Sequence, residues 1–360
     1  MAFPTRTVMP LVVLALATAG CTASDDRPGT QPPTRPPSAS ASVPGPSPTT
    51  SAPSETPVPS ASAYPSVETL DRRMARRGLH RVPPSTWNAA AFGVASFNVL
   101  GASHTRGPAR RQGYAGARAR LPRAIRTLER SGATVAGLQE FQTSQVRQFR
   151  GLVGDRYGVY PGVTLGARPA ENSIVWRTDT WTVVREQTTP VPYFEGGRYL
   201  MPQVLLRHQA SGRLVWFGNF HNPANTFGDA SRWRDEATAL EADLARRLGR
   251  HGTPVVFTGD MNARAEFACP FTAQSGMHSA DGATTRRGEC VLPAEPGIDW
   301  VLGSRAVRFS DFSSNWLPKR RRITDHPLVT ATATLLGVEQ RAGCQARLSS
   351  SGAVWYCRRR

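Results

Sequence analysis

The chain has 360 residues, which allows one large domain or two ordinary ones, and its formal net charge is +18 at pH 7. This excess favours acidic partners such as nucleic acid, anionic lipid or phosphate esters, although much of it reflects a general use of arginine, since Lys319 is the only lysine. Only one apolar run, near the N-terminus, approaches the length of a membrane helix, so the composition excludes a protein with several membrane-spanning helices.

The first 21 residues have the pattern of an export signal. Arg6 provides a short positive region, and the apolar stretch MPLVVLALATAG is too short to be a permanent membrane helix. Small residues then precede Cys21, which resembles a bacterial lipoprotein signal with its lipid-modified cysteine. Thr18 is less usual than leucine at its position, so an ordinary secretory signal is the alternative. We therefore expect an exported protein, either secreted or held on the outer face of the cell membrane only through a lipid on Cys21.

Residues 22–66 consist of Pro, Ser, Thr and Ala with almost no large apolar side chains. Such a segment cannot bury enough surface to offset its ordering entropy, so we expect a disordered tether. Its reach, roughly 3 Å per residue, suits carrying a domain away from a membrane. Residues 67–89 follow as a basic lead-in, in which DRRMARRGLHR is either a short basic helix or the ordered end of the tether.

The region 90–335 alternates strand-like and helix-like segments. Apolar, β-branched and aromatic runs predict strands at 92–100, 134–141, 172–178, 181–187, 297–304 and 324–335, with two more in 203–222 and one in 254–263. Apolar spacing and helix-end signals predict helices at 117–132, 144–153 and 231–252. The strands at 172–178 and 181–187 are close enough to form a hairpin. The natural fold is two mixed β-sheets packed face to face with helices outside.

Four cysteines remain apart from Cys21, and an even number in an exported protein indicates disulfides. We favour the pairs that are close in sequence, Cys269 with Cys290 and Cys344 with Cys357. The second pair would close a C-terminal tail at residues 336–360. A zinc site is the alternative, but the spacings contain no C-x-x-C pair and no histidine sits beside them, so we do not expect one.

Polar side chains that carry chemistry recur at the ends of the predicted strands. If such groups were buried without partners, each would cost roughly several kcal/mol. The least costly arrangement makes them converge on one another and on a cation. We interpret His104, which lies just past the first strand, as an ordinary loop histidine and do not count it among them. The converging set is Asn98, Glu140, His221, Asp260, Asn262, Asp299, Asp325 and His326.

The ordered motifs SFNVL, GLQE, NSIVWR, FHN, TGDMNA, IDWVL and TDHPLV resemble the endonuclease/exonuclease/phosphatase superfamily, which includes deoxyribonuclease I, inositol polyphosphate 5-phosphatases and bacterial sphingomyelinases. Each motif alone is weak, but the series in this order is specific. The resemblance covers residues 90–335 and implies an α/β (α+β) fold, a four-layer sandwich. It also implies hydrolysis of phosphoester bonds that depends on Mg²⁺, with Mn²⁺ or Ca²⁺ as alternatives.

The resemblance implies a metal site and an activated water. Glu140 matches the principal metal ligand, with Asn98 beside it and Asp325 facing the metal, and hard oxygen ligands suit Mg²⁺. Asp260 matches the group that positions or deprotonates the attacking water. Asn262 lies two residues further on, where a strand would place it on the same face, and it matches a donor to the phosphate oxygens.

The resemblance also implies contacts to the scissile phosphate. His326 matches an imidazole cation on the phosphate, and Asp299 matches the carboxylate that orients it and raises its pKa. His221 matches a second histidine on the phosphate. Arg198 and Asn222 fall in loops near the expected substrate, and the sequence at Asn222 departs from the family pattern. We therefore expect these two residues to bind substrate.

The function that these patterns favour is a metal-dependent phosphoester hydrolase, namely a secreted or surface-tethered monomeric nuclease. The basic cluster at 319–322 would attract a polyanion such as nucleic acid. A phosphatase or a sphingomyelinase-like lipid phosphodiesterase on the same site is the first alternative, since loops around a shared site set the substrate. A non-catalytic binding module that kept the fold is the second alternative, and it would show neither turnover nor metal dependence.

Overall fold

The computed structural model describes residues 64–108 and 110–358. The expected signal peptide, Cys21 and the tether up to residue 63 therefore lie outside the described residues. Among the helices of the described part, none is both long and apolar enough to cross a membrane.

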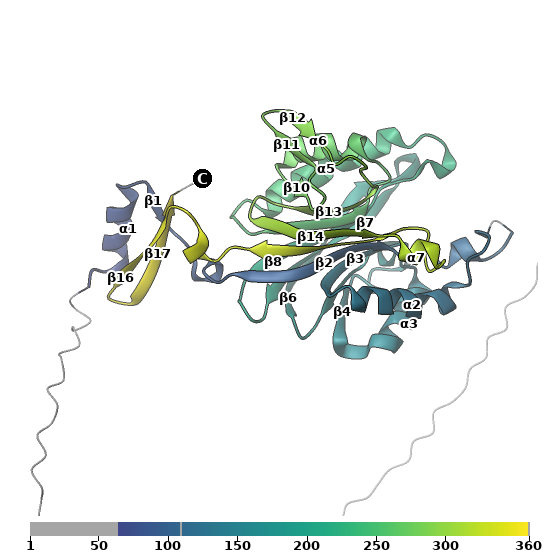
Figure 1. The fold of residues 1–360 in the computed structure, drawn as a ribbon, viewed down its shortest axis with the longest axis horizontal. Helices are drawn as coiled ribbons and strands as arrows, with labels where there is room; N and C mark the ends of the chain where they lie inside the picture. The colour runs from purple at the N-terminus through teal and green to yellow at the C-terminus, as the bar shows by residue number, and fades with distance from the viewer. Residues whose placement is uncertain (1–63, 109, 359–360) are drawn as a thin grey trace, which may run out of the picture. The chain divides into compact units, whose positions relative to one another are not determined.

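Two six-stranded mixed sheets form the centre of the domain (Figure 1). The first sheet has the strand order β14-β15-β2-β3-β5-β4. Its strands are β2 (Ala90–Asn98), β3 (Ala133–Gln139), β4 (Tyr157–Tyr160), β5 (Ile174–Arg177), β14 (Val307–Asn315) and β15 (Leu328–Leu335). The second sheet has the order β10-β13-β9-β8-β7-β6. Its strands are β6 (Trp181–Pro192), β7 (Arg198–His208), β8 (Leu214–His221), β9 (Val255–Asp260), β10 (His278–Ser279) and β13 (Asp299–Gly303).

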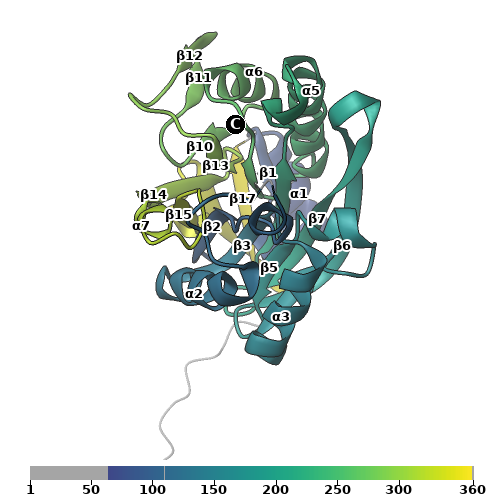
Figure 2. The same cartoon turned by 90° about the vertical axis from the view of Figure 1, so that its right-hand side faces the viewer.

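Helices cover the outer face of each sheet, which confirms the expected four-layer sandwich (Figure 2). One apolar cluster joins the first sheet to its helices, a second joins the second sheet to its helices, and a third fills the space between the sheets. The helices on the first sheet are α2 (Ala117–Arg130) and α3 (Thr143–Val153), and those on the second are α5 (Ser231–Leu248) and α6 (Ala265–Ser275). Two further helices of the sandwich have a single turn each, α4 (Ala167–Ala170) and α7 (Leu317–Arg320).

The apolar runs of the central strands are continuous because both faces of each strand are buried. In β2, Phe92 and Val94 point into the layer between the sheets, while Ala95 and Phe97 belong to the cluster beneath α2 and α3. β2 runs parallel to β3 with α2 between them, and β8 runs parallel to β9 with α5 between them. Each parallel pair brings two strand ends to the same edge of its sheet, and the polar motifs lie at these ends.

One predicted pairing is wrong, because the strands expected at 172–178 and 181–187 do not form a hairpin. β5 pairs with β3 and β4 in the first sheet, whereas β6 pairs along its length with β7 in the second. Trp181, the first residue of β6, is buried between the sheets and donates from Nε1 to Thr134 Oγ1 at 3.0 Å. The short turn therefore carries the chain from one sheet to the other, and the longer pairing with β7 decides the register of β6.

Segments from both ends of the described chain combine into a small unit, here called the terminal module. It contains a three-stranded antiparallel sheet in the order β1-β17-β16, and α1 packs against it. Its elements are α1 (Val67–Ala75), β1 (Leu79–Arg81), β16 (Cys344–Ser349) and β17 (Gly352–Arg358). The basic lead-in and the C-terminal tail, which are far apart in sequence, are therefore two parts of one unit.

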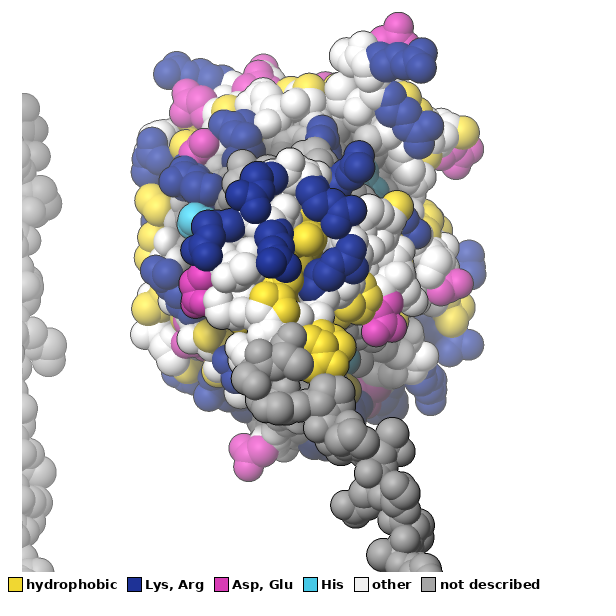
Figure 3. Space-filling model, turned by 90° about the vertical axis from the view of Figure 1, so that its left-hand side faces the viewer, with side chains coloured by type: hydrophobic (Ala, Val, Ile, Leu, Met, Phe, Trp, Pro, Cys, Tyr) yellow, Lys and Arg dark blue, Asp and Glu magenta, His cyan; other side chains and the backbone are white. Residues whose placement is uncertain are grey.

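The terminal module has a small apolar core and a basic surface. Leu70 and Met74 of α1 are buried in that core, and Cys344 forms a disulfide with Cys357 across the two neighbouring strands. Lys and Arg side chains gather on the face drawn in Figure 3, the side on which α1 lies in Figure 1. The exposed arginines of α1 and the turn after it are Arg72, Arg73, Arg76 and Arg77.

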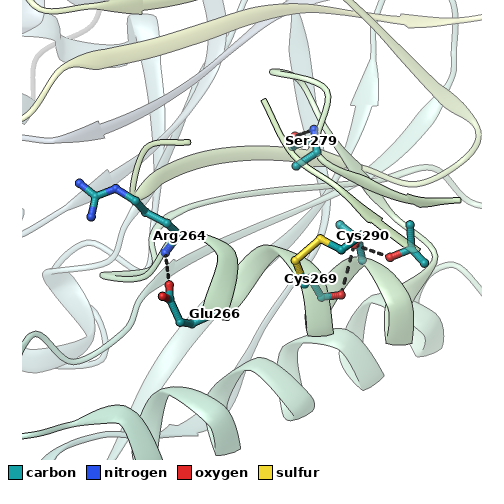
Figure 4. The surroundings of a disulfide bond; sticks show 8 residues. Arg264, Glu266, Cys269, Ser279 and Cys290 are labelled. Atoms are coloured by element: carbon teal, nitrogen blue, oxygen red, sulfur yellow. Dashed lines mark hydrogen bonds between the residues drawn. A yellow bond between two sulfur atoms is a disulfide. The ribbon is translucent and has the colours of Figure 1, made fainter. Parts of the chain in front are cut away.

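The second disulfide joins Cys269 on α6 to Cys290 on β12 (Glu289–Val291), the partner strand of β11 (Thr284–Arg286) (Figure 4). Both disulfides are the sequence-local pairs that the spacing favours. This second one attaches a two-stranded ribbon to the helix above the second sheet.

Candidate active site

Three neighbouring strands of the second sheet place an imidazole and two carboxylates side by side. His221 on β8 lies opposite Asp260 on β9, and Asp299 on β13 lies opposite Asp260 from the other side. Directly opposite residues on neighbouring strands point to the same face of a sheet. His221 Nε2 accordingly lies 3.7 Å from Asp260 Oδ2. The three residues form one row at the end of the sheet.

The first sheet contributes the other half of the site. Asn98 lies opposite Gln139, so Asn98 and the next residue of the partner strand, Glu140, leave the sheet at the same edge. Asn98 Nδ2 donates to Glu140 Oε1 and to Asp260 Oδ2, both at 3.0 Å. Its Oδ1 accepts from Leu100 N at 3.0 Å, so the amide nitrogen rather than the oxygen faces Glu140. Asn98 therefore connects the carboxylates of the two sheets instead of offering them a free oxygen.

The sheets approach closely beneath this site because Gly137 has no side chain. A Cβ atom there would lie 2.0 Å from Thr258 Oγ1 and 2.3 Å from Asn219 Oδ1. Asn219 accepts from Gln139 Nε2 at 2.6 Å and donates to Leu138 O at 2.9 Å. This buried polar network crosses between the sheets and orients their strand ends relative to each other.

Glu140 is held as an anion at the end of β3. Its Oε2 accepts from Gly101 N at 2.8 Å and lies 3.2 Å from His104 Nε2. Burial acts to raise the pKa of Glu140, but His221, His104 and the hydrogen bonds from Gly101 and Asn98 hold this pKa below its usual value. Its backbone φ of 55° is unusual for a residue other than glycine, and such strain concentrates at functional sites.

His326 completes the site as a cation between acids. Its Nδ1 lies 3.0 Å from both carboxylate oxygens of Asp299, and its Nε2 lies 3.6 Å from Asp260 Oδ2. Burial alone would lower the pKa of His326, but the negative charges of Asp260, Asp299 and Asp325 raise this pKa to about 10. Burial raises the pKa of Asp299 to about 6, because the favourable charge of His326 offsets only part of the desolvation. At neutral pH these directions favour a His326 cation paired with an Asp299 anion.

Asp325 and His326 lie in the bend before β15 rather than on a strand, and they face different partners. Asp325 forms an ion pair with Arg111, whereas His326 turns to Asp299. The bend before β15, and not the alternation of side chains along a strand, produces this split between two directions.

Arg120 ties together the two loops that carry these residues. Its side chain is buried in α2, with a relative exposure of 1% for the residue. Nη1 donates to Val99 O and to Ile323 O at 2.9 Å, and Nη2 donates to Leu100 O at 2.8 Å. One guanidinium group therefore joins the segment after β2 to the segment that leads into Asp325.

Asn262 does not share a strand face with Asp260, because β9 ends at Asp260. Asn262 has a φ of 49°, its backbone N–H donates to Asp260 Oδ1 at 3.1 Å, and its Nδ2 donates to Asn222 O at 2.8 Å. Asn222 is itself buried, and its Nδ2 points to Glu241 Oε2 at 3.5 Å. Burial raises the pKa of Glu241 well above its usual value, which favours the neutral carboxyl group. Asn222 therefore holds the side chain of Asn262 in place from the interior of the protein.

Arg198 lies at the exposed start of β7, and its Nη1 donates to Pro190 O at 3.4 Å. Among the contacts of the described residues, none joins Arg198 to the carboxylates of the site. Its neighbour Tyr199 instead stacks on the ring of Tyr193.

Three residues of the site were not expected from sequence. His104 contacts Glu140, Arg111 pairs with Asp325, and Arg120 braces both loops. His104 stands six positions after Asn98, and this proximity is the one sequence signal that favoured it. Both arginines are indistinguishable in sequence from the many solvated arginines, because their partners come from distant segments.

The donor set fits a hard divalent cation. Asp260, Asp299 and His326 offer ligand atoms that all lie within 4.8 Å of one another. Asp260 and Asp299 pair with His326, whereas Glu140 and Asp325 pair with His104 and Arg111, which are about half exposed, so Glu140 and Asp325 are the carboxylates more accessible to an ion. Oxygen donors of this kind suit Mg²⁺, Mn²⁺ or Ca²⁺.

A two-sheet sandwich with carboxylates, amides and imidazoles gathered at its strand ends defines a class of hydrolase that acts on phosphoester bonds. A model of the endonuclease/exonuclease/phosphatase family matches residues 95–326, and the chain belongs to this family. The family consists of metal-dependent phosphoesterases, and divalent metal ions are its usual cofactors. No curated protein matches the sequence.

Solved structures share the fold at low sequence identity. A family member from Bacteroides thetaiotaomicron superposes with a TM-score of 0.54 and 16% identity, over 69% of this chain and 97% of that chain. A mannosyl-6-phosphatase of the same organism gives a TM-score of 0.52 and 16% identity over 67% and 99%. The catalytic domain of human nocturnin, with a bound sulfate, gives 0.51 and 14% over 72% and 97%. At these identities the likeness establishes the fold alone.

Proposed function

We propose that the protein is an exported nuclease that cleaves phosphodiester bonds with a metal-assisted, activated water. The observation that carries this proposal is the row of His221, Asp260 and Asp299, which Asn98 joins to Glu140 across the two sheets. The two disulfides support export, since such bonds persist in oxidising compartments. Cys21 then serves as the lipid attachment site of a surface-tethered form.

Asp260 is the proposed general base. It is buried, its Oδ1 accepts from Asn262 N, and its Oδ2 accepts from Asn98 while facing the two imidazoles. These donors fix the carboxylate in one orientation, so that a water beside it can transfer a proton to the carboxylate as it attacks phosphorus.

His326 and His221 are the proposed phosphate contacts. Their Nε2 atoms lie 3.6 and 3.7 Å from the same Asp260 oxygen, so a phosphate group near Asp260 meets both imidazoles. The carboxylate of Asp299 keeps His326 protonated and correctly oriented, which gives a positive donor for the charge that develops on the phosphate oxygens. Asn262, braced by Asn222, is the proposed neutral donor beside them.

Glu140 and Asp325 are the proposed metal ligands, and Asn98 orients Glu140. A bound divalent ion would supply positive charge to the phosphate oxygens and to the leaving group. Glu140 is ionised and partly accessible, with 14% of its side chain exposed, and Asp325 can exchange its partner Arg111 for an ion because Arg111 is half exposed.

Basic side chains near the site support a polyanionic substrate. Arg111 and Arg322 are exposed, and Arg322 Nη1 reaches Gly113 O at 3.2 Å, on the same loop as Arg111. Lys319 and Arg320 of the short helix α7, with Arg321 and Arg322 directly after it, add further cations just before Asp325. A long phosphodiester chain would engage several of these charges at once, whereas a small phosphomonoester would engage few.

Incubation of the protein with supercoiled plasmid and Mg²⁺ tests the proposal, with parallel reactions that contain EDTA, His326→Ala or Glu140→Gln. We expect nicking in the first reaction only. Intact plasmid in every reaction would contradict a nuclease. Release of phosphate from sugar phosphates, or cleavage of sphingomyelin, would then support the phosphatase or lipid phosphodiesterase alternative, and silence on all substrates would favour a binding module.

A further inference from the structure

A row of aromatic side chains runs from the edge of the second sheet that carries His221 to the solvent. It begins with Tyr193, whose ring stacks on Tyr199 with centroids 4.0 Å apart and an interplanar angle of 20°. Burial raises the pKa of Tyr193, and the charges of Tyr199, Glu171, Glu140 and Asp260 raise it further. The turn that joins β6 to β7 also lies at the same edge of the second sheet as His221, because β7 begins where its antiparallel partner β8 ends.

Phe194 continues the row in the turn between β6 and β7. Its ring meets Tyr193 edge to face with centroids 4.8 Å apart, and it meets Phe227 in the same way at 5.2 Å and 84°. Trp233 on α5 supports Phe194 from a third side at 6.3 Å. Edge-to-face contacts of this kind add about 0.5–1.5 kcal/mol each to the burial of the rings.

Phe227 ends the row and is 78% exposed, more than any other large apolar side chain of the described residues. Burying such a ring would gain about 1.5–3 kcal/mol. A single exposed phenylalanine is ordinary on a protein surface. This one differs because its row of contacts begins at the edge of the sheet that carries His221 and because it follows His221 by six positions, on the loop that leaves β8.

The loop that carries Phe227 is braced. Asn225 Oδ1 accepts from Ala230 N at 3.1 Å and from Arg234 Nη1 at 2.8 Å, and the same Nη1 donates to Pro223 O at 2.8 Å. These hydrogen bonds order the loop that carries the ring. A ligand that stacks on the ring therefore costs this loop little conformational entropy.

We propose that Phe227 is a stacking platform for an unpaired nucleobase next to the scissile phosphate, which makes single-stranded nucleic acid the preferred substrate. This inference rests on the proposed nuclease function and specifies its substrate. A planar base presents a flat face to the exposed ring while its phosphate reaches the imidazoles, whereas a base inside a duplex has both faces covered by its neighbours. Stacking on an aromatic side chain contributes about 1–3 kcal/mol per base, or roughly 5- to 150-fold in affinity.

The surroundings of Phe227 favour a base over a lipid chain. Phe227 is the one aromatic residue of the loop between β8 and α5, whose polar residues include Asn225, Thr226 and Asp229. An acyl chain needs a continuous exposed apolar surface, whereas a planar base needs only the one exposed ring.

Cleavage of two single-stranded oligonucleotides tests the inference, one with normal bases and one of equal length in which tetrahydrofuran units replace the bases. Both carry the same phosphates, so only stacking separates them. We compare the wild-type protein with Phe227→Ala, Phe227→Trp and the control Phe312→Ala, which removes a 41% exposed phenylalanine from the edge strand β14.

The expected result is a 5- to 150-fold lower kcat/KM, mainly through KM, for Phe227→Ala on the oligonucleotide with bases. Phe227→Trp and Phe312→Ala should match the wild type, and all variants should cut the abasic oligonucleotide alike. Quenching of a 2-aminopurine base on binding in EDTA should also require an aromatic ring at 227. Equal loss on both oligonucleotides, or no loss on either, would overturn the stacking role while leaving the nuclease proposal intact. A wild-type protein that cuts neither would instead overturn the nuclease proposal, and the stacking role with it.

Discussion

The end of the sandwich that carries the proposed site, here called the catalytic end, and the terminal module differ in what holds them together. At the catalytic end, buried polar groups such as Asn98, Asn219 and Arg120 join segments that are far apart in sequence. In the terminal module, a small apolar cluster and the disulfide between Cys344 and Cys357 join neighbouring strands and one helix.

The difference follows from what each region has to specify. A polar network is satisfied only in one geometry, so it positions charged groups to within hydrogen-bond tolerance, at the expense of desolvation. A small core cannot supply much stability, and a disulfide compensates by restricting the unfolded chain without demanding a functional geometry. Substitutions should therefore affect activity at the catalytic end and local stability in the terminal module.

The largest effect is expected from His326→Ala. Loss of the positive donor beside Asp260 and Asp299 should lower kcat by about 10²- to 10⁴-fold. Circular dichroism should show that the fold is kept, although Asp299 loses its partner. Activity of at least half the wild-type value would show that the row of carboxylates works without this imidazole.

The same residue predicts a pH dependence of stability. The pKa of His326 is raised from 6.5 to about 10 in the folded protein, so its pairing contributes stability that is fully present below about pH 6.5 and is lost as the pH rises through about 10. Urea unfolding in EDTA at pH 6.5 and pH 10 measures this loss. His326→Gln should lose less stability than the wild type over this interval, and identical losses would contradict the ion pair.

Arg120→Leu should be the most destabilising single change at the catalytic end. It leaves the buried carbonyl groups of Val99 and Ile323 without their donor, whereas Leu100 O keeps Gln145 Nε2, and each group without a donor costs about 1–3 kcal/mol. We expect the free energy of unfolding to fall by about 3–5 kcal/mol, with a loss of activity as the loops separate. Arg126→Leu, an exposed position further along the same helix, is the matched control and should change stability by less than about 1 kcal/mol.

Replacing both Cys344 and Cys357 with serine should lower the stability of the terminal module and leave the activity almost unchanged. Their sequence separation of 13 corresponds to a disulfide contribution of about 3 kcal/mol. Hydrogen exchange should increase in β16 and β17, while kcat on a short oligonucleotide stays within twofold of the wild type. A large fall in kcat would show that the terminal module helps to position the site.

The smallest effect is expected from changing the four exposed arginines of α1 and the turn after it, Arg72, Arg73, Arg76 and Arg77, to glutamine. All four are exposed, and the pairs four residues apart repel each other by about 0.2–0.5 kcal/mol. At low salt the variant should be as stable as the wild type or slightly more stable, and kcat on a short substrate should not change. Destabilisation by more than about 1 kcal/mol would reveal that these arginines hold the module in place.

Local patterns determined much of this protein from sequence. The strands at β2, β3 and β9 and the helices α2, α3 and α5 follow from residue composition and apolar spacing, which depend only on neighbouring residues. The polar residues at the strand ends stood out because a buried strand does not tolerate them singly. Most of the site was therefore visible as a set of side chains that required common partners.

The tertiary structure alone decided which partners they found. Whether β6 pairs with β5 or β7, whether Asn262 continues a strand or leaves it, and which of many arginines braces the site depend on contacts between distant segments. Arg120 reads in sequence as one more solvated cation of α2, and only the packing of α2 against two loops makes it structural. Phe227 likewise reads as one residue of a polar loop, and only the contact with Phe194 connects it to the site. Residue composition and the spacing of apolar residues are local properties of the sequence, whereas the burial of a side chain and the pairing of strands depend on the whole fold.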